Sequence, residues 1–231
     1  MNGPDDAAAR GGDDARTLGA DDVPDVVDVL CDAFEDYPVM RYVLDSPDEP
    51  DERYRRRLRT LIHFFVMARV LRDEALLGID AGGGLGAAAT ISYSWTPGSP
   101  AELGELRESV WAELGPAARA RYEEFGAAAS AFSVDSPHMH LNMIGVRSSL
   151  QGSGLGGRLL DAVHRFSRED RRSEGVSLDT NTRNVPLYER FGYEVIGRAR
   201  IGPELEIWGL YRPTHPSPTT TRDTVPPAER T

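Results

Sequence analysis

A short glycine-rich run, Gly152-Ser153-Gly154-Leu155-Gly156-Gly157, constrains the fold of this chain more than any other segment. It follows the apolar run Met139–Val146, which is typical of a strand, and it opens a stretch from Leu155 to Asp170 whose apolar residues recur at helical spacing. Glycines let the backbone approach a bulky anion closely, and the first N–H groups of a helix lack acceptors and lie at the positive end of its dipole. The run therefore predicts a phosphate or pyrophosphate site between a strand and a helix.

Three other interpretations of this run compete with a pyrophosphate site. A Walker loop is excluded because no Lys followed by Ser or Thr closes the motif. A dinucleotide site fits the spacing of the glycines, and Asp179 stands where a ribose-binding acid belongs. However, Arg147–Gln151 separates the strand from the glycines, and only about thirty folded residues follow Asp179, too few for the rest of a doubly wound sheet. A turn that binds nothing is the remaining alternative.

The order of the other elements predicts one mixed α/β (α+β) domain over residues 16–212, with a central sheet flanked by helices. The Gly- and Asp-rich residues 1–15 and the Pro- and Thr-rich residues 213–231 are expected to be disordered tails. A loop is expected around Pro38, Pro47 and Pro50. The expected helices are Asp22–Phe34, Asp51–Arg69, Ala101–Ala131 with a break at Gly115-Pro116, Leu155–Asp170 and Val185–Phe191; the expected strands are Thr17–Leu18, Ala75–Asp80, Leu85–Ser94, Met139–Val146, Val176–Thr180, Tyr193–Ile201 and Leu205–Tyr211.

Composition narrows the class of partner. The net charge of -11 disfavours nucleic acid, whose phosphates need clustered Lys and Arg. The single cysteine, Cys31, is expected to be a small core residue, and no Cys/His spacing indicates a metal site. No apolar run is long enough to span a bilayer, and the first residues lack the features of a signal peptide, so no membrane partner and a cytoplasmic location are expected.

Two segments together resemble the GNAT superfamily of N-acetyltransferases. Gln151, Gly154 and Gly156 fit the family's signature loop, and the strand Leu141–Val146 resembles its fourth strand. The run from Asn184 to Tyr193 resembles the family's other recurrent segment. The resemblance extends over about residues 138–212 and is greatest to the puromycin N-acetyltransferase branch.

The resemblance implies a sheet whose fourth and fifth strands splay apart, with the arm of acetyl-CoA lying in the gap. Ile144 and Val146 would offer free backbone groups to that arm, and the N–H of Val146 would polarise the thioester carbonyl. Asn184 would hydrogen-bond the cofactor. The pyrophosphate would be held by Gln151, Gly152, Ser153, Gly154, Leu155 and Gly156.

The resemblance also implies catalytic roles. Tyr188 would be the general acid that protonates the leaving thiolate, and the alternative is an aromatic residue that only packs on the core. His138 and His140 lie on one face of the expected strand, where His140 would be the general base and Asn142 would orient a water. A histidine without a catalytic task, with a water chain as the base, is the alternative. His164 is expected to be structural.

The predicted function is acetyl transfer from acetyl-CoA to a primary amine, without a metal. The alternative is a module of the same fold that binds acyl-CoA without turnover. The acceptor stays open, although residues 35–70 and 95–135 are expected to frame its pocket, and homodimers are common in the family. The aromatic residues of these two segments singled out for that pocket are Tyr37, Tyr42, Phe64, Phe65, Trp95 and Trp111.

Overall fold

The computed structural model describes residues 15–45, 51–202 and 205–214. Seven strands form one sheet in the order β1-β2-β3-β4-β5-β7-β6, in which the β4–β5 pair alone is parallel. The predicted mixed α/β class is thereby confirmed. The strands are β1 (Arg16–Leu18), β2 (Leu76–Ala81), β3 (Gly84–Tyr93), β4 (Met139–Val146), β5 (Gly175–Asn181), β6 (Glu194–Ile201) and β7 (Leu205–Pro213).

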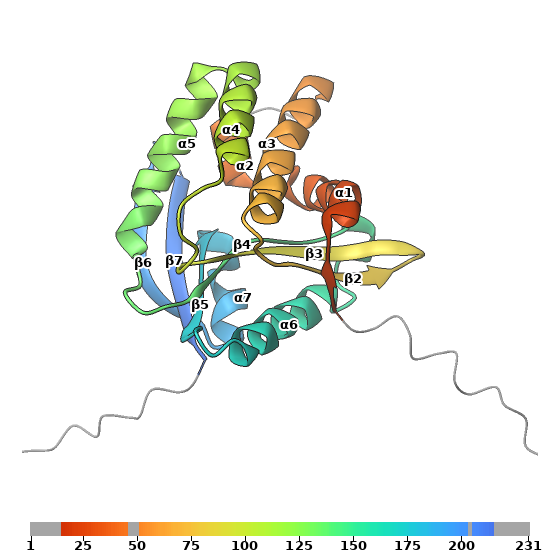
Figure 1. Cartoon of the computed structure of the whole chain (residues 1–231), viewed down its shortest axis with the longest axis vertical. Helices are drawn as coiled ribbons and strands as arrows, with labels where there is room; N and C mark the ends of the chain where they lie inside the picture. Colours follow the sequence, from red (N-terminus) through yellow and green to blue (C-terminus); the bar gives the residue numbers. More distant parts are fainter. Residues whose placement is uncertain (1–14, 46–50, 203–204, 215–231) are drawn as a thin grey trace, which may run out of the picture.

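Helices cover both faces of the sheet. In Figure 1, α1 to α5 gather on one side of the strands and α6 and α7 on the other. The buried side chains accordingly form two clusters, one between the sheet and α1–α5 and one between the sheet and α6–α7. The helices are α1 (Val23–Phe34), α2 (Pro38–Leu44), α3 (Glu52–Leu71), α4 (Ala101–Leu114), α5 (Pro116–Ala129), α6 (Leu155–Glu169) and α7 (Val185–Arg190).

Helix α2 stands where the sequence predicted only a loop around Pro38. Proline was counted as a helix breaker, yet it is tolerated in the first turn, where its missing N–H would have no partner. Pro38 occupies that first turn, and Tyr37 before it is extended. Val39, Met40 and Val43 are buried, so packing against the core stabilises this short helix.

The expected break in the fourth helical stretch is confirmed. Gly115 has a φ of 87° and ends α4, and Pro116 then begins α5. Arg57 of α3 donates to the carbonyl oxygens of Leu44 and Leu114, at the ends of α2 and α4, at 3.0 Å each. Arg57 therefore joins α3 to the ends of α2 and α4.

A bulge in the β3–β4 pair changes which face each β4 side chain takes. Thr90 pairs with Met143 and Ile91 pairs with Leu141, so Asn142 is skipped. Leu141 belongs to the buried cluster under α6–α7, whereas Met143 belongs to the cluster under α1–α5. Before the bulge the odd-numbered residues of β4 face α6–α7, and after it they face α1–α5. The even-numbered residues change face in the opposite direction.

Strands β4 and β5 separate after a short paired stretch. Their register covers Met139↔Val176, His140↔Ser177 and Leu141↔Leu178 alone, while β5 stays paired with β7 as far as Asn181↔Ile207. The remainder of β4 thus faces a gap in the sheet. This is the expected splay of the fourth and fifth strands.

Several smaller expectations can be compared with the structure. Cys31 is half-buried and packs against the cluster under α1–α5, and burial raises the pKa of its thiol to about 11. Apart from Ala15, Pro213 and Thr214, the expected tails lie outside the described residues. Within the described residues, no helix is long and apolar enough to cross a membrane, and His, Cys, Asp and Glu nowhere group in threes to form a metal site.

Candidate active site

A cavity of about 260 Å³ lies where β4 and β5 separate. Because the strands diverge there, residues from both faces of the sheet line one continuous space. The lining of polar and aromatic residues on the α1–α5 side includes Tyr37, Phe65, Arg69, Tyr122, Phe125, His140, Asn142 and Asp179, and the α6–α7 side contributes Asn184 and Tyr188.

The exposed backbone edge of β4 faces the gap. The N–H of Arg147 donates to the carbonyl of Gly86 in β3 at 2.9 Å. Since alternate residues of a strand direct their backbone groups to opposite edges, Val146 and Ile144 direct theirs away from β3 and toward the gap. Nε2 of Gln151 reaches the carbonyl of Val146 at 3.4 Å. Gln151 and Val146, both expected to hold acetyl-CoA, are thus in contact.

The glycine-rich loop has the backbone geometry that its sequence predicts. Gly152 and Gly154 have φ values of 79° and 87°, which favour glycine. The first helical hydrogen bond of α6 runs from Arg158 N to Gly154 O, so by the geometry of helix ends the N–H groups of Leu155 and Gly156 have no acceptor within the helix. Residues 151 to 154 are exposed. The loop can therefore present free N–H groups to an anion.

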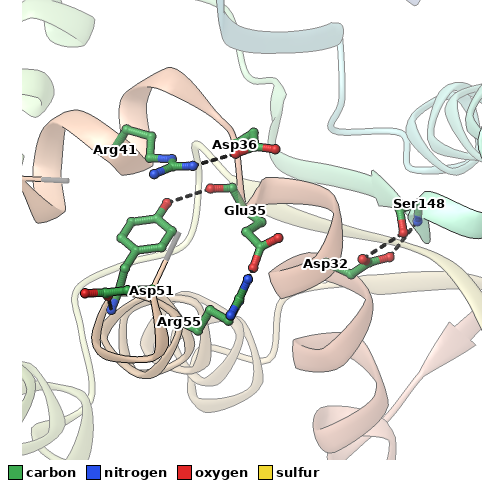
Figure 2. Close-up of polar contacts among 8 residues, drawn as sticks. Asp32, Glu35, Asp36, Arg41, Asp51, Arg55 and Ser148 are labelled. Atoms are coloured by element: carbon green, nitrogen blue, oxygen red, sulfur yellow. Dashed lines mark hydrogen bonds and ion pairs between the residues drawn. The ribbon is translucent and has the colours of Figure 1, made fainter. Parts of the chain in front are cut away.

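Helix α1 holds the turn that leads into this loop. The Asp32 carboxylate accepts hydrogen bonds from N of Ser148 at 2.5 Å and from Oγ of Ser148 at 2.9 Å (Figure 2). Directly after the end of α1, Glu35 pairs with Arg55 of α3 at 2.5 Å (Figure 2). The carbonyl of Glu35 also accepts a hydrogen bond from the hydroxyl of Tyr54 at 2.9 Å. The end of α1 is thus fixed to α3 on one side and to the loop on the other.

Tyr188 reaches the cavity from α7. Its side chain is buried, its ring packs edge-on against Tyr193 with centroids 5.6 Å apart, and among the described residues its hydroxyl has no hydrogen-bond partner. Burial, and secondarily the nearby Tyr37, raises the pKa of Tyr188 well above its usual value. Tyr188 therefore stays protonated at neutral pH, as a proton donor must.

His140 lies beside two polar residues of β5. Its Nδ1 is 2.8 Å from Oγ of Ser177, within hydrogen-bond distance, and its Nε2 is 3.8 Å from Oδ2 of Asp179. Burial, with smaller contributions from His138 and Arg69, lowers the pKa of His140 to about 4. Burial also raises the pKa of Asp179 to about 7. His140 is therefore neutral at neutral pH, and the same burial makes its imidazole a weaker base.

His138 does not join this group. Its Nδ1 lies 2.7 Å from the carbonyl of Ser136, its ring packs edge-on against Tyr211, and it does not line the cavity. His164 is buried with its Nε2 3.0 Å from the hydroxyl of Tyr193, which agrees with the structural role expected for it.

The sequence did not single out an ion cluster beside the cavity. Glu74 is fully buried between Arg69 and Arg72, with N···O distances of 3.0 Å and 3.2 Å. Arg69 also donates to Oδ1 of Asn142 at 2.8 Å and lines the cavity. The sequence does place Arg69, Arg72 and Glu74 within six residues. That spacing alone does not indicate the turn that brings their side chains together.

The aromatic residues predicted for the acceptor pocket divide into two groups. Tyr37 and Phe65 line the cavity, while Tyr42, Phe64, Trp95 and Trp111 do not. The cavity instead takes Tyr122 and Phe125 from α5. Both residues lie in the segment 95–135 that was expected to frame the pocket. Their spacing in the sequence does not show whether their side chains line the cavity or pack in the core.

Comparisons with known proteins agree with this geometry. Residues 113–205 match the family model described as an acetyltransferase (GNAT) domain. The chain is similar to a structure from Corynebacterium glutamicum described as histone acetyltransferase HPA2 and related acetyltransferase, with 22% identity, a TM-score of 0.59 and coverage of 90% of this chain and 99% of that one. It is also similar to an agmatine N-acetyltransferase (19% identity, TM-score 0.58, coverage 86% and 98%) and to a polyamine N-acetyltransferase from Drosophila melanogaster (19%, 0.57, 85% and 97%).

At these identities the solved structures show a shared fold. The family model adds the segment that holds β4, the glycine-rich loop, α6, β5 and α7. Residues 113–205 therefore match a GNAT acetyltransferase domain, and this match together with the shared fold supports an acyltransferase.

Proposed function

We propose that the protein transfers an acetyl group from acetyl-CoA to the primary amine of a small molecule or peptide. The observation that carries this proposal is one continuous cavity that crosses the sheet at the gap between β4 and β5. Tyr188 and Asn184 line it from one face, and His140 lines it from the other. A thioester entering from the side of α6 and α7 would therefore meet an amine entering from the side of α1–α5.

The cofactor would lie along the exposed edge of β4. Its pyrophosphate would accept hydrogen bonds from the loop and first turn formed by Gln151, Gly152, Ser153, Gly154, Leu155 and Gly156. Its arm would pair with the backbone of Ile144 and Val146, and Asn184 would hydrogen-bond it from α7. The N–H of Val146 would donate to the thioester oxygen as negative charge develops there.

In the reaction, the amine would first lose a proton to Nε2 of His140. Its nitrogen then attacks the thioester carbonyl carbon, forming the C–N bond, and the C–S bond breaks to release a thiolate. The Tyr188 hydroxyl gives its proton to that sulfur and is reprotonated by the proton that the new amide nitrogen sheds. His138 is the weaker candidate for the base because it lies outside the cavity lining.

Two of the similar structures support an amine acceptor, since they are described as agmatine and polyamine N-acetyltransferases. The run from Asn184 to Arg190 supports the further proposal of a puromycin N-acetyltransferase-like branch. A cytoplasmic location and a homodimer stay expectations.

Calorimetry with CoA and a thiol-release assay with a panel of amines test the proposal together. We expect CoA to bind and an amine to be acetylated. Binding without turnover on any amine would instead support a non-catalytic acyl-CoA module, and the absence of CoA binding would refute both.

Replacing Tyr188 with Phe tests the acid. The change should lower kcat by roughly ten- to a thousandfold. Tyr193→Phe is the matched control, because Tyr193 is equally buried and packs beside Tyr188 but bonds to His164 instead of lining the cavity. Equal rates for the two variants would remove Tyr188 from the mechanism.

A further inference from the structure

The α1–α5 side of the cavity carries a single carboxylate. Asp179 is the first residue of β5 beyond its last pair with β4, and Val176 and Leu178 pack on the opposite face, under α6–α7. Its side chain is 18% exposed, Nε2 of His140 lies 3.8 Å from its Oδ2, and Tyr37 is near enough to interact with it electrostatically. A carboxylate that is largely desolvated, accepts no hydrogen bond from the described residues and lines a cavity is suited to an ammonium group brought by a ligand.

Aromatic and apolar side chains form much of the remaining lining on this side. Phe65 of α3 and Tyr122 of α5 pack together with ring centroids 5.6 Å apart, and Phe125, Met40 and Val43 extend the same wall. The total cavity is about 260 Å³, and the acetyl end of the cofactor would take part of it, so the acceptor is small.

The guanidinium group of Arg69 lies beside these aromatic and apolar side chains. Arg69 is held by Glu74 behind it and reaches Oδ1 of Asn142 at 2.8 Å. Asn142 and His140 lie two residues apart on β4, before the bulge reverses the faces, so Arg69 is roughly 7 Å further along the cavity than the His140–Asp179 pair. A second ammonium group on the acceptor would meet a guanidinium there.

We propose that the acceptor is a primary monoamine carried on a small apolar or aromatic body, with Asp179 holding its ammonium group beside His140 and Arg69 excluding acceptors that carry a second positive charge. This inference rests on the proposed function. It assigns Asp179 a role in binding the acceptor and in the first step. The ammonium group gives one proton to the His140–Asp179 pair, which passes it to water, and the neutral amine then attacks as above.

An acceptor panel tests the substrate class. With the full chain and acetyl-CoA, kcat/KM for 2-phenylethylamine should exceed that for putrescine or agmatine by about ten- to a hundredfold, the factor that burial of a Phe-sized group corresponds to. A preference for the diamines would overturn the inference and leave the proposed transfer intact. If neither kind of amine is acetylated, the proposed function fails instead.

Asp179→Asn tests the anchor. We expect KM for 2-phenylethylamine to rise about tenfold or more, because a charge-assisted hydrogen bond is lost, while KM for acetyl-CoA stays within about twofold. Asp161→Asn, which removes an exposed carboxylate on α6, is the control for net charge. If both variants keep the wild-type KM for the amine, Asp179 does not bind the acceptor.

Asn142→Asp tests the role of Arg69 without disturbing its contact with Glu74. A carboxylate in the place of this amide would neutralise Arg69 and should raise kcat/KM for putrescine relative to 2-phenylethylamine by about tenfold. An unchanged ratio in a folded variant would contradict exclusion by Arg69.

Discussion

The buried Glu74 gives the most direct test of how the acceptor side of the cavity is held together. Its carboxylate is completely inaccessible, and its two partners Arg69 and Arg72 are 14% and 20% exposed. Oε1 of Glu74 also accepts a hydrogen bond from N of Tyr93 at 3.3 Å. Glu74→Ala would leave two neighbouring guanidinium groups without their counter-charge.

The expected loss follows from that burial. Removing one partner of a buried ion pair costs about 3–5 kcal/mol, because the remaining charge is desolvated and unpaired. Arg72 is partly exposed and keeps a hydrogen bond to Oγ of Ser99 at 3.2 Å. Its loss of Glu74 should therefore add little to the loss in free energy of unfolding that Arg69 causes. At a urea dependence of about 2 kcal/mol per molar, the unfolding midpoint should fall by roughly 1.5–2.5 M.

Urea unfolding followed by circular dichroism measures this change. Asp80→Ala is the matched control, because Asp80 also pairs with an arginine, Arg16, at 2.9 Å, but its side chain is 48% exposed. An exposed pair contributes less than about 1 kcal/mol, so the control should barely move the midpoint. If Glu74→Ala loses no more than the control, the buried cluster does not stabilise the domain and the argument is wrong.

Three further changes have defined outcomes. Asp32→Asn should weaken CoA binding about three- to tenfold in calorimetry, because the turn before the glycine loop loses its anchor, whereas Asp28→Asn on the same helix should not. Gly154→Ala should cost about 1–2 kcal/mol of stability because of its φ of 87°, since no atom lies within 4 Å of the added carbon to cause a clash. Gly126→Ala inside α5 should instead stabilise the protein. Thermal unfolding that ranks the two variants the other way would refute this expectation. Burial raises the pKa of Asp179 from 3.8 to about 7, so the folded state favours the neutral acid. The wild type should therefore lose stability relative to Asp179→Asn as the pH rises from about 4 to about 7. An equal difference in Tm between the two proteins at about pH 5 and pH 8 would contradict this expectation.

Local patterns in the sequence predicted the elements on the α6–α7 side of the cavity. The loop from Gln151 to Gly156 needs glycines at positive φ, and the strand before it and the helix after it carry periodic apolar residues. Tyr188 and Asn184 belong to one short segment that follows β5 directly. Such features depend on neighbours in the chain, and local physics constrains them strongly.

The acceptor side could not be predicted in the same way. Arg69, Asp179 and Tyr122 come from α3, β5 and α5, which are separated by tens of residues. Hydrophobic periodicity shows that an aromatic residue is buried, but it does not distinguish a core contact from a cavity wall. In the sequence, Asp179 resembles only a candidate ribose ligand, because its nearness to His140 depends on strand pairing.

By itself, then, the sequence determined the order of the strands and of every long helix, the glycine-rich loop and the segment that carries Tyr188. The tertiary structure decided which face each residue of β4 takes. The skipped residue Asn142 reverses the alternation of side chains, so that His140 faces the acceptor side while Ile144 and Val146 turn toward the cofactor side. A bulge arises from pairing with a partner strand about fifty residues earlier in the chain, and an alternation of apolar residues within one strand carries no record of it.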